Sequence, residues 1–514
     1  MSYEYLHIGR ASELQNKKDR YLYRFFEILP GALSWSTLVL MVILSGWRPV
    51  WAAFFIIAFD LYWLVKTAYL SAHLRSNWKR LKYNIKSDWN ERLINFKYDH
   101  LRHLVLLPFY KEERMVLEET LDALVASTYD HEKIFIVLAY EERAGLEAEN
   151  TAKQIKGKYS SNFGEFIITK HPKDLEGEMA GKGSNIAHAA HEAKKLIVDA
   201  KNIPYEDVIV SAFDIDTHVY PQYFSCLTWY YLTTENSQRS SFQPVPLYNN
   251  NIWDAPALSR VVATAGTFWQ MIQQERPERL ATFSSHSMSF KALDELGFWQ
   301  KNIVSEDSRI FWNSLMFFNG DYKVVPMAYP VSLDANFTKS FFKTALNNYR
   351  QQRRWAWGVE NVPYLLFGCV RNKMIPLKKR LHFAFVQLEG FWSLATNPLI
   401  IFFLGWLPLA LGGTQFNKTL LSYNLPRLTR DLMTIAMLGL IVSVIISLSF
   451  LPPRPKNKSR RTYLYLILQW LMIPLTIPLL GAIPGLDSQT RLMFGRYMGF
   501  WVTPKFRKEK ESML

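Results

Sequence analysis

The stretch from Val208 to Asp216, VIVSAFDID, decides how the chain is expected to fold. Its apolar part predicts a buried β-strand that ends at two aspartates. Upstream, short apolar runs alternate with helical patterns, which predicts an open, mostly parallel α/β sheet whose ligands bind at the carboxyl ends of the strands. The other expected strands are 103–110, 133–140 and 164–170, and the expected helices are 112–128 and 183–200.

The two aspartates, Asp214 and Asp216, form a candidate metal site. Two carboxylates two residues apart at a strand end can hold one divalent cation through their oxygen atoms. Mg²⁺ or Mn²⁺ in that position would neutralise a diphosphate. The alternative is an Asx turn with a solvated neighbour, because this short pattern is common by chance.

Two further segments place polar groups at the starts of expected helices. Gly177 to Asn185, GEMAGKGSN, opens a helix at which Lys182 can meet a phosphate; a flexible loop with a helix cap is the alternative. Ser305-Glu306-Asp307 precedes an apolar helix. Asp307 is a candidate general base that takes a proton from an acceptor hydroxyl. In the alternative, the acidic pair only complements the helix dipole.

The segment from Phe341 to Tyr364 combines arginines with aromatic residues. Gln351, Arg354 and Trp355 stand in the spacing Q-x-x-R-W. The planar donors of an arginine match phosphate oxygens two at a time, and a Trp face suits a sugar ring. The segment therefore predicts a nucleotide-sugar site at a membrane surface. An interfacial helix with a solvated basic face is the alternative.

Apolar runs near both ends of the chain approach the ~20 residues that cross a hydrocarbon core. Ile28–Leu44 and Val50–Leu70 predict a transmembrane hairpin, because no cleavage site separates them from the rest. Pro474 and Pro478 leave open whether the last run spans or is broken and re-entrant. The basic tail around Lys505 favours re-entry. The three late runs lie within 382–411, 432–451 and 463–480.

The composition favours anionic partners and a membrane. Among 514 residues, 60 Lys and Arg against 45 Asp and Glu give a net charge of +15, and 15% of the residues are aromatic. Nucleic acid is not expected as a partner, because no nucleic-acid motif appears. Two separated cysteines, Cys226 and Cys369, predict a reducing compartment. The histidines show no metal spacing; His286, in TFSSHSMSF, is a candidate for lining a pocket, with packing as the alternative.

Taken in order, the motifs resemble those of a membrane-embedded family 2 inverting glycosyltransferase. Relatives of this kind include cellulose synthase, hyaluronan synthase and ceramide glucosyltransferase. The resemblance implies a GT-A domain, a Rossmann-like mixed α/β sheet, inserted between transmembrane helices, with amphipathic interface helices. The motifs are LLPFYKEE (106–113), GKGSN (181–185), DIDT (214–217), SED (305–307), QQRRW (351–355) and FWVTPK (500–505).

At the matching positions the resemblance implies roles for single residues. Asp214 and Asp216 would hold the donor diphosphate through a divalent metal, and Asp307 would be the catalytic base. The sequence departs from the family pattern at Lys111, where relatives have Asn, and after the second strand, which leaves the nucleotide open. The other implied roles are donor or acceptor binding by Lys182, Glu306, Gln351, Arg354 and Trp355, nucleotide binding by Pro108, Tyr110, Glu112 and Glu141 (or Glu142), and gating by Phe500, Val502 and Thr503.

The expected layout places the catalytic domain on the cytoplasmic side of the cell membrane, because dense positive charge follows the hairpin. The oligomeric state is left open. The expected parts are a cytoplasmic segment (1–27), a transmembrane hairpin (28–71), a GT-A domain (72–336), interfacial helices (337–381), a region of about three apolar segments (382–482) and a basic tail (483–514).

The predicted function is metal-dependent hexosyl transfer, with inversion, from a nucleotide-sugar to a glycan or lipid acceptor; a UDP-sugar is the favoured donor. The tail motif favours processive polysaccharide synthesis, whereas the small number of spans favours a single transfer to a lipid. A membrane transporter or scaffold with an inactive α/β domain is the rival from another class.

Overall fold

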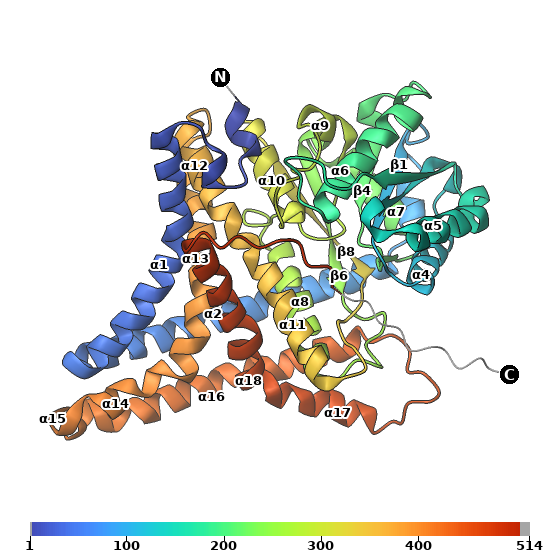
Figure 1. The fold of residues 1–514 in the computed structure, drawn as a ribbon. Helices are drawn as coiled ribbons and strands as arrows, with labels where there is room; N and C mark the ends of the chain where they lie inside the picture. The colour runs from blue at the N-terminus through green and yellow to red at the C-terminus, as the bar shows by residue number, and fades with distance from the viewer. Residues whose placement is uncertain (1–2, 504–514) are drawn as a thin grey trace.

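The computed structural model of the protein describes residues 3–503, except for the side chains of residues 3–4, 436–438 and 440. Its central feature is one mixed sheet packed between helices, and long helices extend away from that domain (Figure 1). The predicted α/β domain flanked by apolar helices is therefore confirmed.

Within the described residues, eight strands form the sheet in the order β3-β2-β1-β4-β7-β6-β8-β5. The half containing β3, β2, β1 and β4 is parallel, whereas β7 runs antiparallel to both β4 and β6. The parallel half thus ends at β4, the strand that leads into Asp214. The strands are β1 (Arg102–Phe109), β2 (Ile134–Glu141), β3 (Glu165–His171), β4 (Val208–Ala212), β5 (His218–Val219), β6 (Ser240–Leu247), β7 (Ser287–Ser289) and β8 (Lys323–Ser332).

Two apolar cores lie on opposite faces of the sheet, because successive side chains of a strand point to opposite sides. Leu104 and Leu106 of β1 pack with α6 and α10, while Val105 and Leu107 pack with α4, α5 and α7. The helices of this domain are α3 (Trp89–Leu93), α4 (Arg114–Val125), α5 (Leu146–Tyr159), α6 (Lys182–Ala193), α7 (Tyr223–Thr233), α8 (Ala257–Gln274), α9 (Phe290–Glu295) and α10 (Glu306–Phe317).

The expected strands and helices are present with small shifts at their ends. The helix expected over 183–200 starts at Lys182 and changes into a π-helical turn at Lys194–Asp199. The start at Lys182 matters, because it puts this side chain at a helix N-terminus beside the carboxyl end of β4.

Among the described residues, three helical segments are long and apolar enough to cross a membrane: Lys17–Trp47, Pro49–Lys86 and Thr462–Met493. A fourth is counted if Leu377–Phe402 and Leu404–Leu411, bent by 49°, form one span. The helices of this part are α1 (Lys17–Trp47), α2 (Pro49–Lys86), α13 (Leu377–Phe402), α14 (Leu407–Leu411), α15 (Gly413–Asn417), α16 (Leu420–Ser449), α17 (Thr462–Leu468), α18 (Ile473–Ile477) and α19 (Ile483–Met493).

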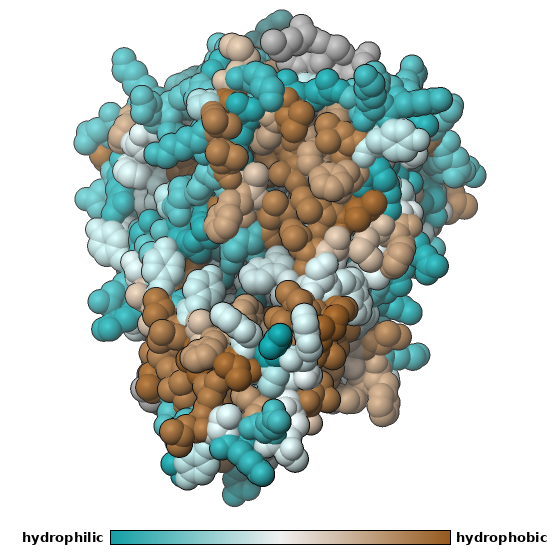
Figure 2. All heavy atoms as spheres, turned by 90° about the vertical axis from the view of Figure 1, so that its left-hand side faces the viewer, coloured by the Kyte–Doolittle hydropathy of each residue, from teal (hydrophilic) through white to brown (hydrophobic). Residues whose placement is uncertain are grey.

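Charged residues inside the apolar helices have polar partners on neighbouring helices. Lys66 of α2 lies 2.7 Å from Glu389 of α13, and Thr429 of α16 donates to Asp60 of α2 over 2.8 Å. Such pairing removes the high cost of a lone charge among apolar side chains. Figure 2 shows the molecule from the left-hand side of Figure 1. Apolar side chains gather on the lower part of that view, where the ends of α1, α2, α14 and α16 lie.

The last apolar segment, Thr462–Met493 (the broken segment), is helical throughout, but its α-helical hydrogen bonding is interrupted near Pro474 and Pro478. A 3₁₀ turn (Gln469–Met472) and a π-helical turn (Pro478–Ala482) interrupt the helix around α18. Both of its ends contact parts near the α/β domain: the Tyr463 ring lies 5.7 Å from that of Trp253, and Asp487 is paired with Arg353 at 2.9 Å.

The segment that carries Q-x-x-R-W forms α11 (Phe341–Ala356), followed by a 3₁₀ turn (Trp357–Glu360) and α12 (Asn361–Arg371). The polar residues Thr344, Asn348 and Gln351 are buried, whereas Phe341 and Phe342 are exposed. A helix that turns its apolar face outward suits a membrane boundary.

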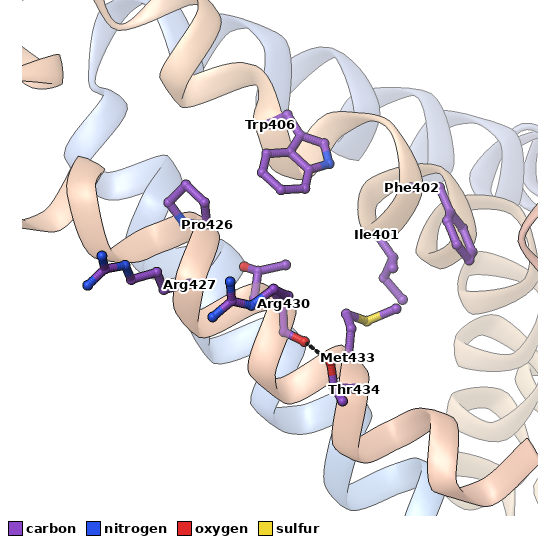
Figure 3. Close-up of a pocket in the computed structure, with 9 residues that line it drawn as sticks. Ile401, Phe402, Trp406, Pro426, Arg427, Arg430, Met433 and Thr434 are labelled. Carbon is purple, nitrogen blue, oxygen red and sulfur yellow. Dashed lines mark hydrogen bonds between the residues drawn. The ribbon is translucent and has the colours of Figure 1, made fainter.

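A cleft of about 440 Å³ lies between α16 and the bend after α13 (Figure 3). Arg427 and Arg430 line one wall, and Trp406 and Ile401 line the other. Arg430 is paired with Asp431 at 3.0 Å, so part of the charge of this cleft is already balanced.

Gly164, just before β3, provides a test of the sheet packing. A Cβ at this position would lie 2.1 Å from the backbone oxygen of Glu132. We expect Gly164→Ala to destabilise the protein by about 1–3 kcal/mol, because the backbone must shift to admit the methyl group. Gly157→Ala is the matched control: nothing lies within 4 Å in α5, and the change should stabilise by up to about 1 kcal/mol. Equal melting temperatures for both variants would contradict this packing.

Candidate active site

Lys182 is the meeting point of three segments that are far apart in the sequence. Its Nζ lies 2.6 Å from Asp214 Oδ1, just after β4, and 3.0 Å from both carboxylate oxygens of Asp307, at the start of α10. Glu306 Oε1 lies 3.9 Å away. Gly183 permits this approach of α6 to α10, because a Cβ there would lie 3.1 Å from Glu306 Cβ.

Hydrogen bonds from surrounding loops hold both aspartates of the D-x-D sequence. Ser284 donates its hydroxyl to Asp214 Oδ2 over 2.6 Å. Asp216 is 1% exposed, and the backbone N–H of Asp334 donates to its Oδ2 over 3.0 Å. Asn250 donates to both the backbone oxygen of Asp216 and Asp334 Oδ1. The loops after β6 and β8 therefore fix Asp216 in place.

Trp355 lies in an aromatic group beside these carboxylates. Its ring centroid lies 5.8 Å from that of Tyr248 and 6.0 Å from that of Phe283. Gln351, one turn earlier on α11, accepts a hydrogen bond of 3.4 Å from Asn336. This group presents flat apolar faces of the kind that sugar rings stack on.

Tyr248 connects the aromatic group to the charged one. Burial raises the pKa of Tyr248 well above its usual value, and the charges of Asp214 and Asp216 raise it further. Arg354 lowers this pKa and Asp307 raises it, by smaller amounts. The charges of all four residues therefore act on one hydroxyl. The aspartates, the late acidic residue and the arginine–tryptophan helix thus converge.

The end of the described chain lies over this site. The ring of Phe500 packs against Gly181, where φ is 155° and a Cβ would lie 2.6 Å from Phe500 Cγ. The Arg354 guanidinium lies 5.2 Å from the centre of the same ring. Val502 is half-buried and Thr503 is buried. Pro504, Lys505 and the basic residues after them lie outside the described residues.

The residues expected at the nucleotide lie at the ends of β1 and β2. Pro108 is buried in β1, and the backbone N–H of Tyr110 donates to Glu112 Oε2 over 2.7 Å. Glu141 is 4% exposed and accepts two hydrogen bonds from Arg143, of 2.5 and 3.0 Å. The Arg143 guanidinium lies 4.4 Å from the Tyr110 ring centre. These residues form a second polar cluster, at the carboxyl ends of β1 and β2.

A sequence model described as glycosyl transferase family group 2 matches residues 209–481, which is more than half of the chain. The chain belongs to this family. The protein is therefore a glycosyltransferase, and its mixed sheet is the GT-A-like domain that the resemblance implied.

Similar solved structures are distant from this glycosyltransferase. The mannosyltransferase PcManGT from Pyrobaculum calidifontis, in complex with GDP-Man and Mn²⁺, is 17% identical, with 76% of this chain and 99% of that chain covered and a TM-score of 0.42. S. aureus TarS 1-349 is 9% identical, with 68% and 91% covered and a TM-score of 0.36. Its complex with UDP-GlcNAc is 10% identical, with 69% and 93% covered and a TM-score of 0.32. No curated protein matches the sequence.

The D-x-D carboxylates of the glycosyltransferase fit a hard divalent cation. Within residues 3–503, no group of three or more His, Cys, Asp or Glu side chains is arranged to hold a metal. Carboxylates of the kind that Asp214 and Asp216 carry are the ligands by which proteins usually hold Mg²⁺ together with substrate phosphates and water.

Several residues of the site belong to no sequence motif. Tyr248, Asn250 and Arg143 lie in loops and turns, and only their contacts reveal them. The Ser-rich run is the exception: Ser284 binds Asp214, and His286 is buried with its Nδ1 3.9 Å from Asp307 Oδ1. Burial lowers the pKa of His286, which keeps this ring neutral beside Asp307.

Burial and neighbouring charges shift the pKa values of Lys182 and Glu306. Burial alone would lower the pKa of Lys182, but Asp214, Asp307 and Glu306 together raise it above its usual value. Burial, aided by the charge of Asp307, raises the pKa of Glu306 to about 8. At neutral pH the cluster therefore holds Lys182 charged and Glu306 largely protonated.

Glu306 makes the stability of the protein pH-dependent. Its pKa is about 8 when folded against 4.5 as the ordinary value, so its contribution is fully present below about pH 4.5 and is lost as the pH rises through about 8. Glu306→Gln keeps the neutral shape, so its melting temperature should fall less than that of the wild type between about pH 5 and pH 9. The exposed Glu113→Gln is the control and should follow the wild type. Parallel curves for all three proteins would show that Glu306 is not buried as a neutral acid.

Proposed function

We propose that the protein is a metal-dependent inverting hexosyltransferase that uses a nucleotide-sugar donor at a membrane surface. One observation carries the proposal: Lys182 contacts both Asp214 and Asp307, so the D-x-D sequence, the S-E-D sequence and the start of α6 share one site. Clusters of carboxylates around a buried ammonium at a strand end are typical of functional sites, which favours an enzyme over a scaffold.

Asp307 acts as the general base in this proposal. It takes the proton of an acceptor hydroxyl while the oxygen forms a bond to the anomeric carbon of the donor sugar. The bond from that carbon to the diphosphate breaks, and the nucleoside diphosphate leaves with the electron pair. Attack opposite to the leaving group inverts the anomeric configuration.

Lys182 and Arg354 bind the departing diphosphate. In the structure, Lys182 is paired with Asp307, and a base with an ammonium at 3.0 Å cannot readily accept a proton. Donor binding draws Lys182 toward the diphosphate, which releases Asp307 for the reaction. Trp355 and Tyr248 position the acceptor sugar or headgroup, and Gln351 orients α11. Positioning and charge stabilisation supply most of the acceleration.

Asp214 and Asp216 would hold Mg²⁺ or Mn²⁺, which would neutralise the diphosphate when bound. Pro108, Tyr110, Glu112 and Glu141 would form the nucleotide end, with Arg143 beside them. A UDP-sugar remains the favoured donor.

The proposal also covers the side of the membrane on which the catalytic domain lies and the class of acceptor. The catalytic domain is proposed to face the cytoplasm, with α11 at the lipid boundary. The contact of Phe500 with Gly181 and Arg354 favours a gate and processive synthesis, with Val502 and Thr503 as its other members. The three or four apolar helices favour transfer of one sugar to a lipid. The size of the labelled product on a gel-filtration column separates the two modes.

Asp307→Asn tests the base. We expect transfer to fall by about 10²–10⁴-fold with an unchanged fold, because the amide cannot take the proton. The rate is measured with labelled donor, and the melting temperature checks folding. Asp321→Asn, on an exposed ion pair with Arg239, is the control and should keep full activity. Full activity of Asp307→Asn would remove Asp307 as the base.

A thermal-shift screen of UDP- and GDP-sugars with Mn²⁺ or Mg²⁺ tests donor binding. One donor should stabilise the protein by about 2.7 kcal/mol when present at about a hundred times its Kd. The shift should need the metal and vanish in Asp214→Asn. Asp207→Asn, directly before the first residue of β4, is the control and should keep the donor-induced shift. If no donor shifts the melting temperature with either metal, the transferase proposal fails.

A further inference from the structure

Arg260, near the start of α8, is a cation buried between the α/β domain and the apolar helices. It is 9% exposed. Its Nε donates to Gln469 Oε1 of the broken segment over 2.7 Å, and its Nη1 donates to the backbone oxygen of Ala255 over 2.8 Å. The guanidinium therefore joins α8 to the broken apolar segment.

Both hydrogen-bond acceptors of Arg260 are neutral. No carboxylate within residues 3–503 forms an ion pair with Arg260, although most buried charges in proteins have one. Burial lowers its pKa accordingly. An anion bound here would supply the missing negative charge.

A small cleft gives access to this cation. Its volume is about 20 Å³, enough for one water molecule or one phosphate oxygen. The end of α16 and the start of the broken segment form its apolar walls, so the cleft lies where the apolar helices meet the α/β domain. Its lining is Ile252, Arg260, Thr264, Ser447, Leu448, Leu451, Leu466 and Gln469.

The larger cleft of Figure 3 differs in its charge balance. There, Arg430 is paired with Asp431, and Arg427 donates to Tyr423 and stacks on its ring at 4.5 Å. Arg260, by contrast, combines burial, neutral partners and an opening among leucines.

The cleft adjoins the apolar cluster that contains the aromatic group of the active site. Leu448, Leu451 and Leu466 belong to the same apolar cluster as Tyr248 and Trp355. On α8, Gly266 packs near Trp355, since a Cβ there would lie 3.6 Å from the Trp355 ring. Six residues separate Arg260 from Gly266, which is about 9 Å along a helix axis. The two positions also lie about a third of a turn apart around the helix, so a headgroup must pass along and around α8 to reach Trp355.

We propose that Arg260 binds the phosphate of an anionic membrane lipid, with the acyl chains against α16 and the broken segment and the headgroup directed to Trp355. Apolar walls favour a lipid over soluble phosphate. Lipid binding by Arg260 does not depend on the proposed function. Only the role of this lipid as the acceptor, a phosphate-bearing lipid with a headgroup hydroxyl, rests on the proposed function.

Lipid binding is measured without any donor, so its result does not depend on transferase activity. The full chain is placed in nanodiscs of phosphatidylcholine with a minor share of phosphatidylglycerol, and retained lipids are counted by native mass spectrometry. Arg260→Gln should weaken phosphatidylglycerol retention about tenfold, since a charge-assisted hydrogen bond is lost. Arg239→Gln, an exposed arginine paired with Asp321, is the matched control and should bind as the wild type does.

Gln469→Glu separates lipid binding from a purely structural link. It places a carboxylate where Gln469 Oε1 now accepts from Arg260, so it keeps the link but supplies an internal counter-ion. We expect this variant to melt no lower than the wild type and to lose phosphatidylglycerol as Arg260→Gln does. If Gln469→Glu retains the lipid, Arg260 is only a structural link and the proposal is overturned.

Two further arms complete the test. Excess inorganic phosphate should leave phosphatidylglycerol bound; equal displacement by phosphate would overturn the lipid as the ligand. With labelled donor, sugar should enter the lipid extract in the wild type and be lost in Arg260→Gln. Retained lipid without any donor binding would refute the proposed function and the acceptor role, yet leave the lipid site standing.

Discussion

The buried ammonium of Lys182 is the interaction on which the rest of the site depends. It lies within 4 Å of Asp214, just after β4, and of Glu306 and Asp307, both at the start of α10. These carboxylates would repel one another without it. Its position is set by backbone features: α6 begins at this residue, and Gly183 lets that helix approach α10. The excess of negative charge is relieved by the proton that Glu306 keeps, because burial disfavours its ionised form.

The second constraint is the orientation of α11. Its polar face points into the protein, where Asn348 donates to Ser259 of α8, and Phe341 and Phe342 at its start point outward. The same helix carries Arg354 and Trp355 into the site and pairs Arg353 with Asp487 of α19. The packing of the apolar helices and the geometry of the site are therefore coupled through a single helix. The contacts of Arg260 add a second connection of this kind.

Much of the fold was predictable because its signals are local. The strands around Leu106 and Val210 are continuous apolar runs, and their alternate residues fill two cores. The D-x-D, S-E-D and Q-x-x-R-W sequences were visible as short motifs. Tyr248, Asn250 and Arg143 were not, because each acts through partners from distant parts of the chain, and a lone Tyr, Asn or Arg in a loop has no distinguishing pattern. Lys182 was singled out as a phosphate ligand, but its pairing with Asp307 had no local signal.

By itself, the sequence determined the class of the domain, the apolar helices and the short list of polar residues at strand and helix ends, because periodicity and spacing act over a few residues. Only the tertiary structure decided which of those residues share a site, which way α11 faces and where the broken apolar segment packs. Those choices depend on burial and on charge pairing between segments more than a hundred residues apart. No local sequence pattern encodes this burial and charge pairing, because both arise only once the chain has packed.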